Sequence, residues 1–278
     1  MTDEVDTLAL VFPFELYGNG GTGAGATALA DYLAEVLEDN ALESRPTRCD
    51  SYRDRVAIRE ISLSAPKALQ SWRTIGRHAL RQAFKQKQRA IWLGGNHLSA
   101  LPVYEELGSS HPSKALVVQF DAHLDIYALH DVTTSLSNGN FLLHSEESLP
   151  SIVNLGHRDL FLPKPEIGKT FAGAHSSLDI ARDIDRVAKD VQRRAEKAER
   201  VWIDIDVDAF DPSHVPGVHH PLPFGLAPLQ VLRLLEAAFT GNVVGIGFSE
   251  FDPGRDRDDR SLGTLGWLLE WLLLAWYE

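Results

Sequence analysis

Short apolar runs of strand length alternate with longer stretches of helical spacing along this chain. The runs lie at residues 8–12, 90–95, 115–119, 152–156, 201–208 and 243–248, with a shorter one at residues 56–58. Strands separated by helices form parallel sheets whose two faces are covered by helices. We therefore predict an α/β fold, with a mostly parallel central sheet inside a three-layer α/β/α arrangement.

The helical stretches complete this pattern. They lie at residues 28–37, 65–87, 181–200, 226–239 and 260–277. The last stretch carries Trp267, Trp271 and Trp276 and is apolar over much of its circumference, so it is a candidate subunit contact as well as core. With 278 residues and 44% hydrophobic content, the chain can bury one large core. We predict a single domain over residues 1–278.

The polar segment at residues 120–125 directly follows an apolar run and reads Phe-Asp-Ala-His-Leu-Asp. Side chains alternate at a strand end, so Asp121, His123 and Asp125 can share one side. Two carboxylates around an imidazole are typical ligands of a divalent metal. The alternative is an ordinary polar strand end followed by a helix cap.

A second segment, at residues 201–208, alternates apolar residues with aspartates. A period of two places Asp204, Asp206 and Asp208 on one face of a strand. Buried carboxylates repel one another and lose hydration, so this arrangement is unfavourable unless cations neutralise it. A solvated edge strand is the alternative, but the intervening apolar residues favour a central strand that leads into a site.

Charge and cysteine content exclude several classes of partner and compartment. The net charge of −12 disfavours nucleic acid and anionic membrane surfaces. Cys49 is the only cysteine, which excludes an intramolecular disulfide and favours a reducing cytoplasm. The apolar stretch at residues 267–277 is too short to span a bilayer and contains Glu270. We predict a cytoplasmic protein without a membrane partner.

A glycine-rich loop at residues 18–25 lies between the first strand and the first helical stretch. A strand, a Gly-x-Gly-x-x-Gly-like loop and a helix in this order resemble a dinucleotide-binding fingerprint. The acid expected at the ribose is missing at the usual distance, because Asp50 comes late. A tight turn without a ligand is therefore the stronger interpretation.

Four motifs together resemble the arginase/agmatinase (ureohydrolase) family. They are Gly-Gly-Asn-His at residues 94–97, Asp-Ala-His-x-Asp at 121–125, Asp-x-Asp-x-x-Asp-Pro at 206–212, and Glu250 before a proline turn. The resemblance covers most of the chain and implies an arginase-like fold. It also implies a manganese-dependent hydrolase that converts the guanidino group of arginine or an arginine-like compound to urea and an amine.

The resemblance further implies two Mn²⁺ ions per chain that share a bridging hydroxide. One ion would be bound by His97, Asp121, Asp125 and Asp206, and the other by Asp121, His123, Asp206 and Asp208. Four carboxylates and two imidazoles suit Mn²⁺ better than Zn²⁺, which usually takes fewer ligands. Among catalytic residues, Asp125 would orient the hydroxide, and Glu250 would pair with the guanidinium group.

The chain departs from the family pattern at the proton-shuttling histidine. No histidine lies at the usual distance after Asp125, and Asn138 is near that place. His144, His219 and His220 are the candidates for this catalytic role, and a surface histidine is the alternative for each. Asn96 also replaces the aspartate of the family's Gly-Gly-Asp-His motif.

The substrate-binding segments differ as well. Tyr127 and Phe161 stand where arginases have an asparagine and an aspartate that bind the amino-acid end of arginine. We therefore expect a guanidino substrate whose α-amino group is absent, modified or in a peptide bond, such as agmatine, a guanidino acid or an arginine-containing peptide. Free L-arginine stays open, because Asp159 is close to Phe161.

Two other functions remain open from the sequence. One is a deacetylase-type hydrolase with a single zinc ion, and the other is a catalytically inactive metal-binding or dinucleotide-binding protein. Family resemblance also implies a homo-oligomer.

Overall fold

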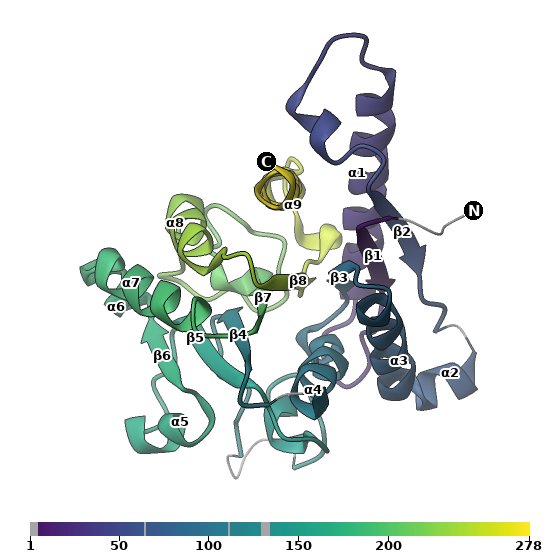
Figure 1. Ribbon diagram of the computed structural model, residues 1–278. Coiled ribbons are helices and arrows are strands. Elements are labelled where there is room, and N and C mark those ends of the chain that lie inside the picture. Colours follow the sequence, from purple (N-terminus) through teal and green to yellow (C-terminus); the bar gives the residue numbers. More distant parts are fainter. Residues whose placement is uncertain (1–4, 64, 111, 129–133) are drawn as a thin grey trace.

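The computed structural model describes residues 5–63, 65–110, 112–128 and 134–278. Across these residues, eight parallel strands form one sheet in the order β2-β1-β3-β8-β7-β4-β5-β6 (Figure 1). The strands are β1 (Thr7–Phe12), β2 (Val56–Glu60), β3 (Arg89–Gly94), β4 (Ala115–Phe120), β5 (Ser151–His157), β6 (Gly173–Ser176), β7 (Arg200–Asp206) and β8 (Val243–Ser249). The predicted parallel α/β fold is confirmed.

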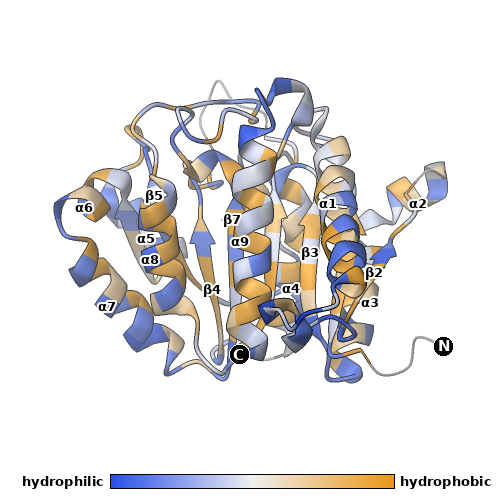
Figure 2. Ribbon diagram, turned by 90° about the horizontal axis from the view of Figure 1, so that it is seen from above, coloured by the Kyte–Doolittle hydropathy of each residue, from blue (hydrophilic) through white to orange (hydrophobic). Residues whose placement is uncertain are grey.

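Helices cover both faces of the sheet, as Figure 1 shows. One face carries α1 (Thr22–Leu42), α6 (Ser177–Arg182), α7 (Ile184–Ala195), α8 (Pro228–Ala238) and α9 (Arg260–Tyr277). The other face carries α2 (Pro66–Gln70), α3 (Trp72–Lys85), α4 (Leu101–Ser110) and α5 (Lys164–Thr170). Each helical layer encloses its own hydrophobic core against the sheet, and the strands between them are largely hydrophobic (Figure 2).

Strand β4 shows why these apolar runs become central strands. All six of its residues are buried, and successive side chains enter opposite cores. Leu116 and Val118 lie in the core on the face covered by α7 and α8, whereas Val117 lies in the core on the other face. Burying a side chain of this size contributes about 1.5–3 kcal/mol, so a solvated position for this run is strongly disfavoured.

Several element boundaries differ from the sequence-based expectation. The helix expected over residues 65–87 is divided at Ser71 into α2 and α3. Two arginines of this stretch pair with α4: Arg81 lies 2.6 Å from Glu106, and Arg73 pairs with Glu105. The strand expected over residues 201–208 ends at Asp206, where the chain turns into a 3-10 helix.

The strand order determines where the four motifs meet. The last strand, β8, lies between β3 and β7, and β4 follows β7. Since all strands are parallel, the carboxyl ends of these four neighbours lie along one edge of the sheet, where ligands collect in α/β proteins. Over the ranges given above, no helix is long and apolar enough to cross a membrane.

Candidate metal centre

The predicted metal ligands come together at the carboxyl ends of β3, β4 and β7. His97 begins a 3-10 helix (His97–Ala100) after β3, and Asp121, His123 and Asp125 follow β4. Asp206 ends β7, and Asp208 lies in the next 3-10 helix (Val207–Ala209). All except the half-buried His123 are buried.

The first ligand group surrounds the Nδ1 atom of His97. This nitrogen lies 3.3 Å from Oδ2 of Asp121, 2.9 Å from Oδ2 of Asp125 and 3.1 Å from Oδ2 of Asp206. Donor atoms of His97, Asp121 and Asp125 all lie within 4.8 Å of one another, close enough to share one ion.

The second group consists of Asp121, His123 and Asp208, whose donor atoms also lie within 4.8 Å of one another. The Nδ1 atom of His123 is 2.9 Å from Oδ2 of Asp208 and 3.8 Å from Oδ1 of Asp121. Asp121 therefore directs Oδ2 toward His97 and Oδ1 toward His123. A carboxylate with one oxygen in each group has the geometry of a bridge between two cations.

Three buried atoms in this cluster support that interpretation. Nδ1 of His97, Oδ2 of Asp121 and Oδ2 of Asp125 have no hydrogen-bond partner of acceptable geometry. Buried polar atoms are normally paired, so three unpaired atoms that converge are suited to hold a cation. Carboxylate oxygens with imidazole nitrogens suit a divalent ion such as Mn²⁺.

The electrostatics lead to the same conclusion. Burial, together with the neighbouring Asp125, raises the pKa of Asp121 to about 7. Burial and Asp208 likewise raise the pKa of Asp206 well above its usual value. Burial opposes protonation of His123, but Asp208 raises its pKa to about 11. The cluster has an excess of buried negative charge, which bound cations would neutralise.

The backbone is strained at two of the predicted catalytic residues. Asp125 and Glu250 have φ angles of 50° and 66°, in the left-handed region that non-glycine residues rarely adopt. Glu250 is held there by a hydrogen bond from its N–H to the carbonyl of Gly95, at 2.8 Å. Such strain is typical of functional sites, where it directs a side chain that a regular strand would turn elsewhere.

Glu250 extends over the ligand groups and is itself tightly held. The backbone N–H of His97 donates to Oε1 at 2.8 Å, and the side-chain amide of Asn19 donates to Oε2 at 2.8 Å. Asn138 approaches Oε1 at 3.5 Å. Together these residues enclose a cavity of about 20 Å³, lined by Asn19, His97, His123, Asp125, Asn138, Asp206, Asp208, His220 and Glu250.

Asn19, which lies in the glycine-rich loop, was not among the predicted site residues. In this loop the N–H groups of Gly21 and Gly23 donate to Oε2 of Glu15 at 2.9 and 2.8 Å. The amides that a dinucleotide phosphate would need are thus paired with a carboxylate of the same chain. Gly25 is required for packing, because a Cβ there would collide with the carbonyl oxygen of Phe251. The close packing at Gly25 explains one glycine of the loop without a bound ligand.

The candidate shuttle histidines occupy different places. His220 lines the cavity, whereas His144 and His219 do not. Burial, with the nearby His219, lowers the pKa of His220, and the two rings lie 4.8 Å apart. The carbonyl of His144 accepts a hydrogen bond from Arg73 at 2.9 Å.

The residues expected at the far end of the substrate lie outside this small cavity. The hydroxyl of Tyr127 accepts a hydrogen bond from the N–H of Leu124 at 3.3 Å. Phe161 is 76% exposed. Asp159 uses Oδ1 to accept hydrogen bonds from the N–H groups of Phe161 and Leu162, at 3.1 and 2.7 Å.

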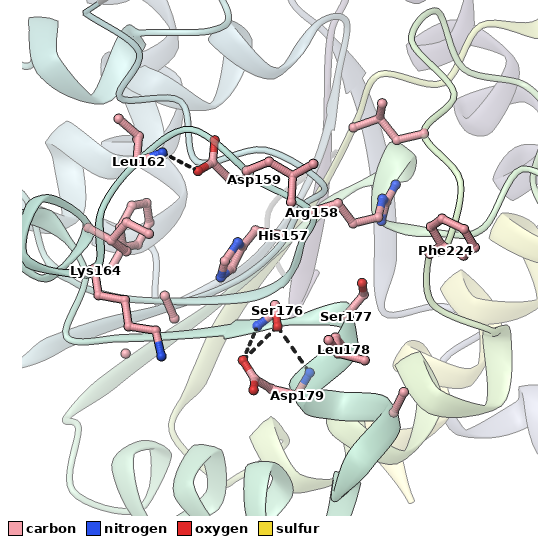
Figure 3. Close-up of a pocket in the computed structure, with 18 of the residues that line it drawn as sticks. His157, Arg158, Asp159, Leu162, Lys164, Ser176, Ser177, Leu178, Asp179 and Phe224 are labelled. Carbon is pink, nitrogen blue, oxygen red and sulfur yellow. Dashed lines mark hydrogen bonds between the residues drawn. The ribbon is translucent and has the colours of Figure 1, made fainter.

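A pocket of about 1270 Å³ opens at the sheet edge, among α5, β6, α6 and residues 222–225 (Figure 3). Figure 3 shows His157, Arg158 and Asp159 on its wall, with Phe224 nearby. Arg158 connects this wall to the ligand groups, because it donates to the carbonyls of Asp208 at 2.6 Å and Ala209 at 3.0 Å.

The chain is similar in sequence to arginases, agmatinases and a related ureohydrolase. The chain is 29% identical to a mitochondrial arginase of Medicago truncatula over 62% of this chain and 50% of that protein. It is 25% identical to an agmatinase of Edwardsiella ictaluri over 92% of this chain and 83% of that protein. It is 30% identical to an N(1)-aminopropylagmatine ureohydrolase of Thermus thermophilus over 68% of this chain and 63% of that protein. The alignments with plant arginases thus span about half the length of those proteins.

Solved structures share the fold at lower identity. A hypothetical agmatinase from Burkholderia thailandensis superimposes with a TM-score of 0.81 at 20% identity, covering 100% of this chain and 87% of that one. An arginase from Bacillus subtilis gives 0.78 at 18% identity, covering 96% and 98%. The arginase family model matches residues 9–271, a span that includes every motif of the candidate metal centre. The chain therefore belongs to the arginase family.

Proposed function

We propose that this protein is a ureohydrolase, which cleaves a guanidino group with water to release urea and an amine. One observation carries the proposal: two ligand groups share Asp121, and their other members line one small cavity together with Glu250. Family membership supports the same reaction class.

The proposed ligands are the six predicted residues His97, Asp121, His123, Asp125, Asp206 and Asp208. Two bound divalent ions, in our proposal Mn²⁺, would supply Lewis-acid activation of a water molecule. The carboxylate of Asp125 would accept a hydrogen bond from that water and orient it toward the guanidinium carbon.

Glu250 is the proposed anchor for the guanidinium group. Its carboxylate faces the cavity, and a charge-assisted pair with a planar guanidinium would fix the orientation of the substrate. Burial raises the pKa of Glu250, whereas Asn19 and the His97 N–H favour its ionised form. These two donors also limit rotation of the carboxylate, so the substrate meets a preorganised group.

His220 is the proposed proton shuttle. Cleavage requires a proton on the leaving amine, and the amide of Asn138 does not titrate. His220 lines the same cavity, and its lowered pKa favours the neutral imidazole near pH 7. A neutral ring nitrogen can accept a proton from the attacking water and pass it to the departing nitrogen.

The proposed substrate has a guanidino group but no free α-ammonium group. An exposed phenylalanine, Phe161, stands where an acid would hold such a group, and Oδ1 of Asp159 is engaged with backbone amides of its own loop. Desolvating an ammonium without a partner costs several kcal/mol. Agmatine or 4-guanidinobutyrate therefore ranks above free L-arginine, and an arginine-containing peptide remains a second candidate. Homo-oligomerisation stays a prediction.

The test compares urea release from L-arginine, agmatine, 4-guanidinobutyrate and an arginine-containing peptide with the Mn²⁺-loaded protein. We expect the highest kcat/KM for a compound without a free α-ammonium group. A wide preference for L-arginine would contradict the substrate proposal. No urea from any guanidino compound would contradict the function.

A further inference from the structure

A buried carboxylate outside the proposed ligand set lies beneath the metal centre. Asp204 is on β7, two residues before Asp206, and is 1% exposed. Its neighbours across the sheet are Gln119 on β4 and Gly247 on β8. A Cβ at Gly247 would lie 3.1 Å from Oδ1 of Asp204, so the glycine leaves room for the carboxylate.

Asp204 contacts the side of His97 that faces away from the ligand groups. Its Oδ2 atom lies 2.9 Å from Nε2 of His97 and 2.7 Å from the hydroxyl of Tyr104, which donates to it. The opposite ring nitrogen, Nδ1, faces Asp121 and Asp125. The imidazole thus lies between Asp204 and the candidate metal position.

Aromatic packing closes this arrangement to water. The ring of Phe141 meets His97 edge-on at 5.1 Å between centroids and meets Tyr104 edge-on at 5.9 Å. Tyr104 is completely buried, and His97 is 1% exposed. The hydrogen bond between His97 and Asp204 therefore has no competing solvent, which strengthens it and fixes the angle of the imidazole ring.

Stability alone does not explain a charged group at this position. A buried carboxylate loses its hydration, and an apolar residue of similar volume at such a place is often neutral or stabilising. The hydrogen bond has a different consequence. The oxygen of Asp204 that accepts from Tyr104 also faces Nε2 of His97, which favours a proton on Nε2 and leaves the lone pair of Nδ1 for a metal ion.

We propose that Asp204, held in place by Tyr104, is the positioning residue of His97. It fixes the tautomer and the orientation of the imidazole and so increases the affinity of the ion beside His97. The ion beside His123 gains nothing from it. This inference rests on the proposed metal centre, since it concerns how one ligand of that centre is prepared.

The experiment measures both Mn²⁺ dissociation constants of the metal-free protein by calorimetric titration, with chelator competition for the tighter ion. Removing such a supporting contact typically lowers metal affinity by about 10–100-fold. We expect Asp204→Leu to lie near the upper end of that range for one ion only. Asp204→Asn keeps the shape and an acceptor oxygen, so it should fall between the parent and Asp204→Leu. Tyr104→Phe should weaken the same ion by a smaller factor.

A matched control is available in the same chain. Asp190 on α7 contacts Nε2 of His175 at 3.1 Å, away from the centre, and Asp190→Asn should leave both dissociation constants unchanged. Equal weakening of both ions by Asp204→Asn, or parent-like binding by Asp204→Asn and Tyr104→Phe, would overturn the inference even if Asp204→Leu does not fold. A parent protein that binds no Mn²⁺ would instead overturn the proposed metal centre itself.

Discussion

Asn19 donates a hydrogen bond to Oε2 of Glu250 at 2.8 Å, although 231 positions separate the two residues. The contact joins the loop before α1 to the residue that follows β8. The orientation of the proposed guanidinium anchor therefore depends on the first loop of the chain as well as on its own strand.

Asn19→Ala should weaken substrate binding. The variant leaves one oxygen of Glu250 without its donor, and hydrogen bonds to charged groups contribute about 1.5–3 kcal/mol, which corresponds to roughly 10–100-fold in kcat/KM. Steady-state kinetics with the best guanidino substrate measures the change. Asn242→Ala is the control. The side-chain amide of Asn242 donates to the carbonyl of Ala198, and neither residue lines the cavity. Equal kinetics for the two variants would contradict a role for Asn19.

Metal content should distinguish shared from unshared ligands. Asp121→Ala removes the carboxylate that belongs to both ligand groups, so it should abolish binding of both ions, and Asp206→Ala is expected to do the same. Asp208→Ala should retain the ion beside His97. Elemental analysis after Mn²⁺ loading gives the number of ions per chain. A single zinc ion that survives Asp206→Ala would exclude the binuclear site.

His220→Ala should lower kcat by roughly a hundredfold, the usual scale for loss of a general acid–base group, while metal content stays at the parent value. His78→Ala on the exposed face of α3 serves as the control. If the large loss appears instead in His144→Ala or His219→Ala, the proton follows a different route. Parent-like kcat in all three variants would assign the step to water or to another group.

The free energy of unfolding at acid pH should depend on the ionisation of Asp190. Burial opposes ionisation of this residue, but hydrogen bonds from Arg194, Arg193 and His175 lower its pKa to about 2. A lowered folded-state pKa stabilises the protein above the unfolded value of about 3.9, and that stabilisation is lost as the pH falls toward 2.

Urea unfolding should therefore show Asp190→Asn to be about 1 kcal/mol less stable than the parent at pH 7, a value reduced for solvent screening. The difference should shrink between about pH 5 and pH 2. A difference that is constant over this range would assign the loss to packing instead of charge.

The proposed ligands were accessible from sequence because each motif is local. The apolar run identifies β4 and places Asp121, His123 and Asp125 at its carboxyl end. However, β4 stops at Phe120, and the three side chains meet in the irregular segment that follows, where Asp125 has a φ of 50°. The prediction that β7 continues with alternating side chains as far as Asp208 is wrong. After Asp206 the chain enters a 3-10 helix, in which the Asp206 side chain accepts the N–H of Asp208.

The supporting residues were not accessible in the same way. Asn19 and Tyr104 act on partners more than 90 positions away, and nothing in their own neighbourhoods marks them. Asp204 was visible as part of an acidic series, but its role depends on which side of His97 it meets. Strand β6 was missed because its four half-buried residues at the sheet edge form no apolar run.

The central place of β8 has a consequence for biosynthesis. Without residues 243–249, the sheet order leaves two separate blocks, β2-β1-β3 and β7-β4-β5-β6. The first block carries His97, and the second carries the aspartates of the ligand groups. Residues 243–249 must therefore be synthesised before these blocks can be joined, so a product that stops before β8 cannot add His97 to the aspartates of the first ligand group. Capture of the ion beside His97 would then report that β8 has been synthesised, whereas Asp121, His123 and Asp208 already lie together on the second block.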